Sequence, residues 1–192
     1  RYPEQRNVWD IDDQFMAGNS MMVCPVTEMN GRERTVVFPD HAGGWFDLHT
    51  HQHYQGGRTD VVPAPLERTP VFVPAGTVLP LSPARQWADE KTDAPLELRI
   101  FPGEDAINCV YFDAGEGHDF EQGEYGWLCL SWYDNARQLH LCSTGVIPSE
   151  FATFQTLEIS LVEHAHVHPV AQVSNREWLT KQMTINTEST DE

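Results

Sequence analysis

The stretch from residue 44 to residue 81 constrains the fold more than any other part of the chain, because turn-forming residues interrupt it every few positions. It contains a Gly-Gly pair at positions 56 and 57 and five prolines, which exclude a long α-helix. The apolar runs between these residues are short and rich in valine and aromatic residues, a composition typical of strands. The stretch therefore predicts four short β-strands joined by rigid turns.

A second set of strands is predicted from residue 96 onward. Residues 96–101 alternate between apolar and polar side chains, which indicates a half-buried strand. Asp134 and Asn135 form a turn dipeptide that predicts a hairpin between the strands on either side. Further strands are predicted over 108–113, 127–132, 138–142 and 154–162.

The order of these segments predicts an all-β chain with two small antiparallel β-sandwich domains. The polar, proline-bounded residues 82–95 read as a connector, so the proximal sandwich is expected over 31–95 and the distal one over 96–173. The tail, 174–192, has one predicted helical turn near 176–182. Its polar, acidic end is expected to be disordered over the last half-dozen residues.

Four motifs follow one another in a fixed order within the first stretch. They are W-x-D-x-x-T at 45–50, Y-x-G-G at 54–57, A-P-L-x-x-x-P-x-F-V at 64–73 and A-G-x-x-L-P-L at 75–81. This order resembles the region that follows the catalytic barrel in glycoside hydrolase family 31, the α-glucosidases, α-xylosidases and their relatives. Flanking matches at 13–18, 21–26, 101–103, 111–113 and Tyr125 extend the resemblance over residues 12–162.

The resemblance implies what the chain contains and what it lacks. Residues 1–30 would be the end of the barrel, with 20–26 as its last parallel strand, which suits their continuous apolar run. Retaining glycosidases use two carboxyl groups about 5 Å apart, and the resemblance places both on earlier barrel strands. The chain is therefore expected to be the C-terminal part of a retaining α-glycosidase that hydrolyses terminal α-linked sugars, without catalytic residues, cofactors or activity of its own.

The same resemblance implies partners. The β domains are expected to buttress the barrel of the parent enzyme, to reach α-linked oligosaccharides only through it, and to offer contacts for a homo-oligomer. With 29 acidic and 12 basic residues the formal net charge is −17, which repels nucleic acid and anionic membranes. No segment approaches the roughly 18 uninterrupted apolar residues of a membrane helix, so a soluble chain is expected.

Four cysteines lie at positions 24, 109, 129 and 142, and no pair has the two-residue spacing of a zinc or redox motif. We expect buried free thiols, because reduced cysteine packs as a small apolar residue. A disulfide between Cys129 and Cys142 is the alternative if these strands pair. Free thiols favour a reducing compartment and hence a cytoplasmic location.

Aromatic residues offer the one binding hypothesis within the chain. Sugar rings pack their C–H faces on aromatic side chains, and Trp127, Trp132 and Tyr133 lie on or beside one predicted hairpin. These three residues are the candidate carbohydrate contacts, and core packing or contact with the absent barrel is the alternative for each. A stand-alone carbohydrate-binding or interaction module is the second functional hypothesis.

The histidine and acidic clusters of the sequence give weaker indications of a functional site. Two histidine triplets, 49/51/53 and 164/166/168, have the alternate spacing that could hold Zn²⁺ from one strand face. The family pattern places the first triplet at a hairpin turn, where the side chains diverge, and the second reads as exposed edge-strand polarity. Paired acids such as Asp12 and Asp13 read as solvated charge, and Ala114 replaces an acid in the loop 113–119, which argues against a cation site there. No metal is expected.

Overall fold

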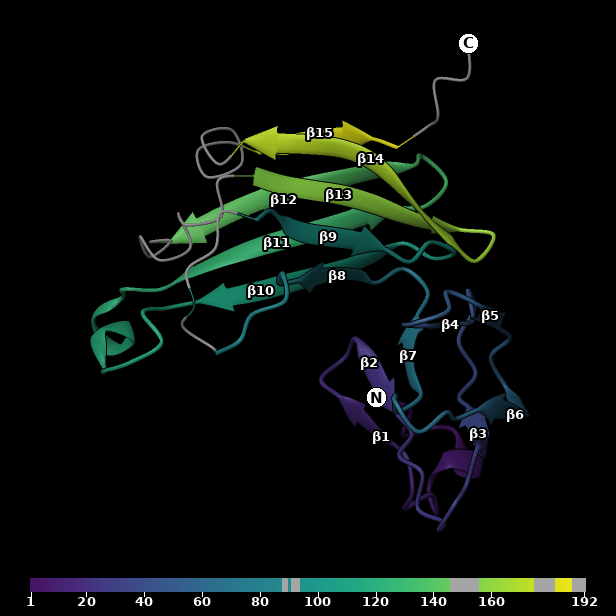
Figure 1. Ribbon diagram of the computed structural model, residues 1–192. Coiled ribbons are helices and arrows are strands. Elements are labelled where there is room, and N and C mark those ends of the chain that lie inside the picture. Colours follow the sequence, from purple (N-terminus) through teal and green to yellow (C-terminus); the bar gives the residue numbers. More distant parts are fainter. Residues whose placement is uncertain (88–89, 91–93, 146–155, 175–181, 188–192) are drawn as a thin grey trace. The chain divides into compact units, whose positions relative to one another are not determined.

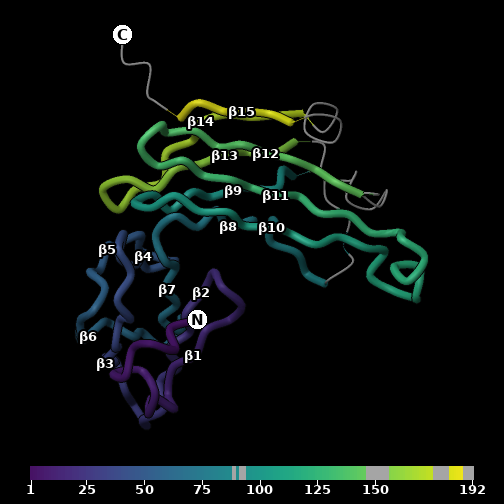
Figure 2. Tube along the Cα trace, turned by 180° about the vertical axis from the view of Figure 1, so that it is seen from behind, coloured from purple at the N-terminus to yellow at the C-terminus, as the bar shows by residue number. Residues whose placement is uncertain are grey.

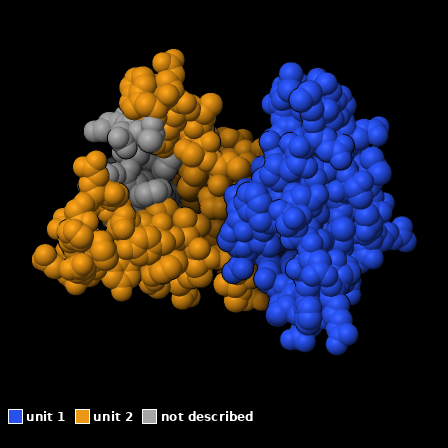
Figure 3. All heavy atoms as spheres, turned by 90° about the horizontal axis from the view of Figure 1, so that it is seen from below, with its two compact units in different colours: residues 1–77, 101–104, 162–167 blue, residues 78–100, 105–161, 168–192 orange. Residues whose placement is uncertain are grey.

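The computed structural model describes residues 1–87, 90, 94–145, 156–174 and 182–187. These residues form strands, two short 3-10 helices (η1, Arg6–Val8, and η2, Asp119–Gln122) and no α-helix, which confirms the all-β class. The chain divides into two compact units (Figure 3). Unit 1 comprises Arg1–Thr77, Phe101–Glu104 and Val162–Val167, and unit 2 comprises Val78–Ile100, Asp105–Leu161 and His168–Glu192.

Unit 1 contains a five-stranded sheet and a two-stranded ribbon (Figure 1). The sheet has the order β1 (Phe15–Ala17), β2 (Met21–Val23), β7 (Val71–Pro74), β4 (Trp45–Asp47) and β5 (His53–Tyr54). The ribbon pairs β3 (Glu33–Phe38) with β6 (Arg58–Pro63). The inward side chains of both form one core, made of Met22, Cys24, Val36, Phe38, Trp45, Val62 and Phe72.

Aromatic rings fill most of this core. The fully buried ring of Phe38 stacks on Tyr54 with centroids 4.9 Å apart and meets the ring of Phe72 edge-on at 4.8 Å. Trp45, also fully buried, donates its indole N–H to the carbonyl of Pro39 at 2.9 Å. The ring contacts add to area burial, and the hydrogen bond removes the cost of burying a polar indole.

The segment predicted as a parallel barrel strand, 20–26, differs from that expectation. Strand β2 pairs antiparallel with β1 on one side and with β7 on the other. Gly18 has a φ of +61°, a conformation that closes the β1–β2 turn at little steric cost for glycine. The apolar run that suggested a strand buried on both faces instead supplies Met22 and Cys24 to the core of unit 1.

Two of the sequence motifs are turns with a clear physical basis. The buried carboxylate of Asp47 accepts hydrogen bonds from the backbone N–H groups of His49 and Thr50, both at 2.7 Å, and so closes the β4–β5 turn. In the Y-x-G-G motif, a Cβ on Gly56 would lie 2.5 Å from the backbone nitrogen of His41. Gly57 has a φ of +73°, so both glycines are required by the backbone.

Unit 2 is a sandwich of two four-stranded sheets, which appear as stacked layers from both sides (Figures 1 and 2). One sheet has the order β10 (Ala106–Phe112), β11 (Gly126–Tyr133), β12 (Gln138–Gly145) and β15 (Met183–Asn186). The other has the order β14 (His166–Ser174), β13 (Thr156–Glu163), β9 (Leu96–Ile100) and β8 (Val78–Leu81). Among the described residues, β10 with β11, β11 with β12, β12 with β15 and β8 with β9 pair antiparallel, whereas β9 and β13 pair parallel, so the predicted antiparallel sandwich is confirmed apart from this parallel pair.

Several segment boundaries differ from the sequence-based expectations. Strand β8 pairs with β9, so the break between the units follows Thr77 and precedes the connector predicted at 82–95. Strand β15 was not predicted, although Met183, Ile185 and Thr187 alternate with polar or exposed neighbours. Residues 176–181 of the predicted helical turn, residues 154 and 155 of the predicted strand, part of the connector and residues 188–192 of the predicted disordered end lie outside the described residues. Thr187, the first residue of that predicted disordered end, is instead buried and donates its hydroxyl to the carbonyl of Arg137 at 2.9 Å.

Candidate functional site

One sheet of unit 2 carries an exposed face with chemically active side chains. Alternate residues of β11 turn inward to the core, and those between them turn outward. We call the second side the outer face. Its members on the three neighbouring strands are Ile107, Cys109, Tyr111, Trp127, Cys129, Ser131, Tyr133, Gln138, His140, Cys142 and Thr144.

The structure separates the three aromatic residues that were predicted to bind carbohydrate. Trp127 and Tyr133 lie on the outer face, 39% and 41% exposed, but six residues apart on one strand, or about 20 Å. Trp132 is 1% exposed and points into the core, where its indole N–H donates to the carboxylate of Asp134 at 2.9 Å. The three residues therefore do not form one binding surface, and Trp132 is a core residue.

A different aromatic group surrounds Trp127, and we call it the aromatic cluster. Tyr111 on β10 lies directly opposite Trp127, with ring centroids 5.1 Å apart, and Tyr125 lies 5.7 Å from Tyr111. Desolvation and, after it, a hydrogen bond to Asp113 raise the pKa of Tyr111. Partly exposed rings beside a carboxylate are the groups that a neutral sugar can stack on and hydrogen-bond to.

In the sequence, Tyr111 and Tyr125 were identified only as members of the family pattern. They were not predicted to lie beside Trp127. The signal that would have done so is the pairing register of the hairpin. Aligning Cys109 with Cys129 across the two strands also aligns Tyr111 with Trp127.

The cysteines lie in two places. Cys109 and Cys129 form a disulfide in the middle of the outer face, so the prediction of free thiols is wrong for this pair, and the bond is not the alternative one to Cys142. Cys24 and Cys142 are free. Cys24 is fully buried in unit 1, which confirms the expectation of a buried free thiol at that position, and burial raises its pKa to about 12. The expectation of a cytoplasmic location was based on four free thiols, and only Cys24 and Cys142 are free.

The first histidine triplet lies at a turn. His51 has a φ of +60° in the β4–β5 connection, and the ring Nε2 of His53 lies 2.8 Å from the carbonyl oxygen of Gly43. In the second triplet, His164 and Ala165 both have positive φ and form the two-residue turn between β13 and β14. Within the described part of the chain, no three histidine, cysteine or acidic side chains come together in a way that could hold a metal ion.

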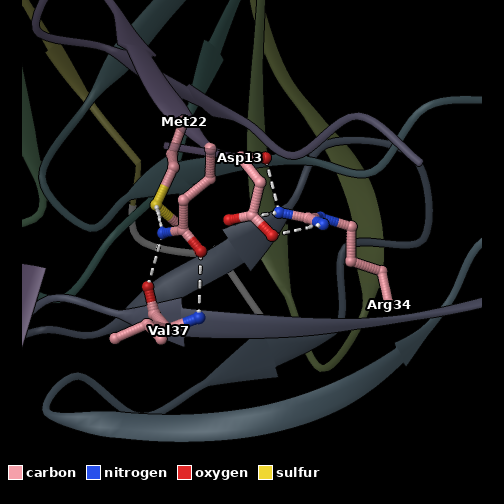
Figure 4. Close-up of polar contacts among 5 residues, drawn as sticks. Asp13, Met22, Arg34 and Val37 are labelled. Carbon is pink, nitrogen blue, oxygen red and sulfur yellow. Dashed lines mark hydrogen bonds and ion pairs between the residues drawn. The ribbon is translucent and has the colours of Figure 1, made fainter. Parts of the chain in front are cut away.

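The acidic segment near the N-terminus is anchored to the core. Two carboxylate oxygens of Asp13 each lie 3.0 Å from a guanidinium nitrogen of Arg34, whose side chain is nearly buried (Figure 4). The side-chain amide of the neighbouring Gln14 accepts a hydrogen bond from the backbone N–H of Val37 at 3.0 Å and donates one to the carbonyl oxygen of Val37 at 2.7 Å. These contacts hold residues 13 and 14 against β3, and Asp13 is occupied by a structural ion pair.

We expect this ion pair to make the stability of unit 1 depend on pH. The hydrogen bond from Arg34, opposed by desolvation, holds the pKa of Asp13 below its usual value. The stabilisation is therefore present above about pH 4 and is lost as the pH falls through the folded-state pKa. The Asp13 side chain is 46% exposed, so solvent screening limits the contribution to about 1 kcal/mol or less.

The measurement is urea unfolding of the wild type and of Asp13→Asn from pH 7 to pH 2.5. The difference between the two should be largest at neutral pH and should shrink as the pH falls through the lowered folded-state pKa of Asp13. Asp12→Asn, which removes the adjacent exposed carboxylate, should leave the pH profile unchanged. A pH-independent difference for Asp13→Asn would contradict the assignment.

No helix among the described residues is long and apolar enough to span a membrane.

Comparisons with known proteins place these features in a family. Residues 1–79 match the model of the glycosyl hydrolase family 31 C-terminal domain. The chain is 30% identical over 138 residues to an α-xylosidase of Saccharolobus solfataricus and 36% identical over 129 residues to the glucosidase 2 subunit alpha of Schizosaccharomyces pombe. These alignments cover 72% and 65% of this chain but only 19% and 14% of the relatives.

A solved structure extends the similarity to nearly the whole chain. The family 31 α-xylosidase of Xanthomonas citri superposes with a TM-score of 0.85 and 27% identity, covering 97% of this chain and 21% of that enzyme. The chain therefore spans about a fifth or less of the length of the proteins that it matches.

Proposed function

Because this chain is a C-terminal part of a glycoside hydrolase family 31 enzyme, we propose that it serves as the β scaffold of a retaining α-glycosidase that acts on terminal α-linked glucose or xylose. The catalytic carboxylates would lie on a barrel outside this chain. By itself the chain is expected to be inactive, and its contribution is to cover and support that barrel.

The exposure of four large apolar side chains on unit 1 is the observation that carries this proposal. Met29 and Leu66 are 93% and 82% exposed, and Trp9 and Phe15 are more than half exposed. Each of these large apolar side chains would lose contact with water if another part of the protein covered it, which would stabilise that contact. The relatives are at least about five times longer than the aligned part of this chain, so their remaining chain is available to cover it.

The test compares one substitution in two contexts. In the chain alone, Leu66→Ser should change stability by less than about 0.5 kcal/mol, because the side chain is exposed there. In the parent enzyme the same change should cost about 1–3 kcal/mol by leaving a hydroxyl in an apolar contact. Differential scanning calorimetry of both proteins measures the effect.

Ile107→Ser is the matched control, because Ile107 is 71% exposed on the outer face of unit 2 and is not part of the proposed contact surface. It should be neutral in both contexts. Equal, small effects of Leu66→Ser in the chain and in the parent would overturn the scaffold surface. Release of p-nitrophenol from α-glucosides or α-xylosides by the purified chain would overturn its expected inactivity.

A second candidate function is glycan binding by the aromatic cluster. The observation that favours it is the grouping of Tyr111, Tyr125 and Trp127, all 38–41% exposed, beside the carboxylate of Asp113. A net charge of −17 suits a neutral ligand better than an anionic one. The ligand would be an α-linked oligosaccharide whose ring faces stack on these side chains.

Titration of the chain with a soluble α-glucan, followed by tryptophan fluorescence, tests this function. Saturable quenching that Trp127→Ala abolishes and Trp9→Ala retains would support the cluster, because Trp9 is exposed on the other unit. If quenching is absent, or if it persists in Trp127→Ala, the aromatic cluster does not bind the glycan.

A further inference from the structure

Three cysteines form a continuous row across the outer face of unit 2. Strand β11 lies between β10 and β12 in the sheet (Figure 1). Cys129 on β11 is paired in register with Cys109 on one side and with Cys142 on the other. Residues directly opposite in antiparallel strands point to the same side of the sheet, so all three sulfur atoms belong to the outer face. Cys129 has two neighbours and can bond only one of them at a time.

Both neighbours lie within bridging distance of Cys129. The Cα atoms of Cys109 and Cys129 are 4.2 Å apart, the separation typical of a non-hydrogen-bonded antiparallel pair. A residue in a central strand directs its backbone N–H and C=O to one side only, so Cys129 and Cys142 form the hydrogen-bonded pair, with Cα atoms about 5.5 Å apart. Disulfides usually span Cα separations of about 4.4–6.8 Å, so the Cys129–Cys142 separation falls within this range and the bonded Cys109–Cys129 pair lies just below it. Cys109 and Cys142 are two strands apart, about 10 Å, and cannot be joined directly.

We infer that Cys109, Cys129 and Cys142 form a thiol–disulfide exchange site in which Cys129 alternates between its two neighbours. The Cys142 thiolate attacks Sγ of Cys129, the Cys129–Cys142 bond forms, and the Cys109–Cys129 bond breaks. Cys109 leaves as a thiolate and takes up the proton that Cys142 released. One disulfide and one thiol are present before and after, so the step requires no oxidant or reductant.

The surroundings of the two terminal cysteines differ, so exchange changes which thiol the protein presents. Cys142 is half-buried, and the side-chain amide of Gln182 donates to its sulfur at 3.8 Å. Cys109 is exposed on β10, an edge strand of the sheet. Once released, Cys109 is the thiol that a low-molecular-weight disulfide can reach. It would then form a mixed disulfide and release one small thiol.

The test is peptide mapping of the intact chain without reductant, with a thiol-alkylating reagent present and acid quenching at intervals. Cys142 should be alkylated directly, and Cys109 should become alkylated together with appearance of a Cys129–Cys142 linkage. In Cys142→Ser the alkylation of Cys109 should be lost, because no internal thiol can displace it. Absence of Cys109 alkylation and of the Cys129–Cys142 linkage in the wild type overturns the proposal.

Two further variants locate the exchange in the row. After oxidation by a low-molecular-weight disulfide, Cys109→Ser should contain the Cys129–Cys142 linkage, and Cys129→Ser should contain no internal disulfide among these positions. A Cys109–Cys142 linkage in Cys129→Ser, or any linkage to the buried Cys24 of unit 1, would mean that the sulfurs meet through unfolding, and it would overturn the site. Circular dichroism identifies a variant that fails to fold, and the wild-type mapping decides the proposal without the variants.

Discussion

Trp132→Ala is expected to destabilise the sandwich of unit 2 by about 3–5 kcal/mol, the cost of removing a large aromatic side chain from a packed core. Trp132 is 1% exposed and lies in the same core as Leu130 and Leu139. The substitution leaves a cavity and also removes the donor that pairs with Asp134. Urea unfolding followed by far-ultraviolet circular dichroism measures the loss as a shift in midpoint.

Trp127→Ala is the matched control, because it removes the same side chain from the opposite face of the same strand. Trp127 is partly exposed, and its ring contacts that of Tyr111, so a loss of about 1 kcal/mol or less is expected. The difference between the two variants tests the register of β11. Equal losses, or a larger loss for Trp127→Ala, would show that the inward and outward faces are wrongly assigned.

Phe38→Ala should destabilise unit 1 by about 3–5 kcal/mol. The Phe38 ring is fully buried and contacts both Tyr54 and Phe72 at less than 5 Å between centroids, so its loss removes contacts with two other strands. Hydrogen exchange is the appropriate measurement, because it resolves amides by position. The amides of β3 and β7 should lose protection by about two to four orders of magnitude.

Val61→Ala provides the comparison for Phe38→Ala. Val61 lies on β6, which pairs with β3, but its side chain is 62% exposed. Its truncation should change protection by less than about threefold, equivalent to roughly 0.5 kcal/mol. Similar effects of the two variants would contradict the placement of Phe38 at the centre of this core.

The row of Cys109, Cys129 and Cys142 and the aromatic cluster both lie on the outer face of unit 2. Cys109 and Cys129 are the next outward residues along β10 and β11 from Tyr111 and Trp127. A fluorescence titration of glycan binding should therefore be made at a defined disulfide state. The two proposals remain separable, because Trp127→Ala leaves the cysteine row intact and Cys142→Ser leaves the aromatic rings intact.

The family pattern was readable from the sequence because its residues have local physical tasks. Asp47 closes a turn through two backbone N–H groups, and Gly56 and Gly57 occupy positions where a side chain would clash or strain the backbone. Such requirements are satisfied within a few residues, so they leave a recognisable spacing in the chain. The strands between these turns followed from the same spacing.

Long-range pairing was not readable in the same way. The parallel pairing of β9 with β13 joins residues about 60 positions apart, and the antiparallel partners of β2 include β7, about 50 residues away. The apolar run at residues 20–26, which contains β2, is compatible both with a parallel barrel strand and with a central strand of an antiparallel sheet. The local sequence of a strand therefore does not determine which distant strand it pairs with.

By itself, the sequence determined that this chain is an all-β C-terminal part of a family 31 enzyme, because turn residues act locally and keep a fixed order. Only the tertiary structure decided that Trp132 is buried while Trp127 is exposed, and that Cys129 lies between two cysteines. Those outcomes depend on strand register, and a shift of one residue would turn every side chain of β11 to the other face of the sheet.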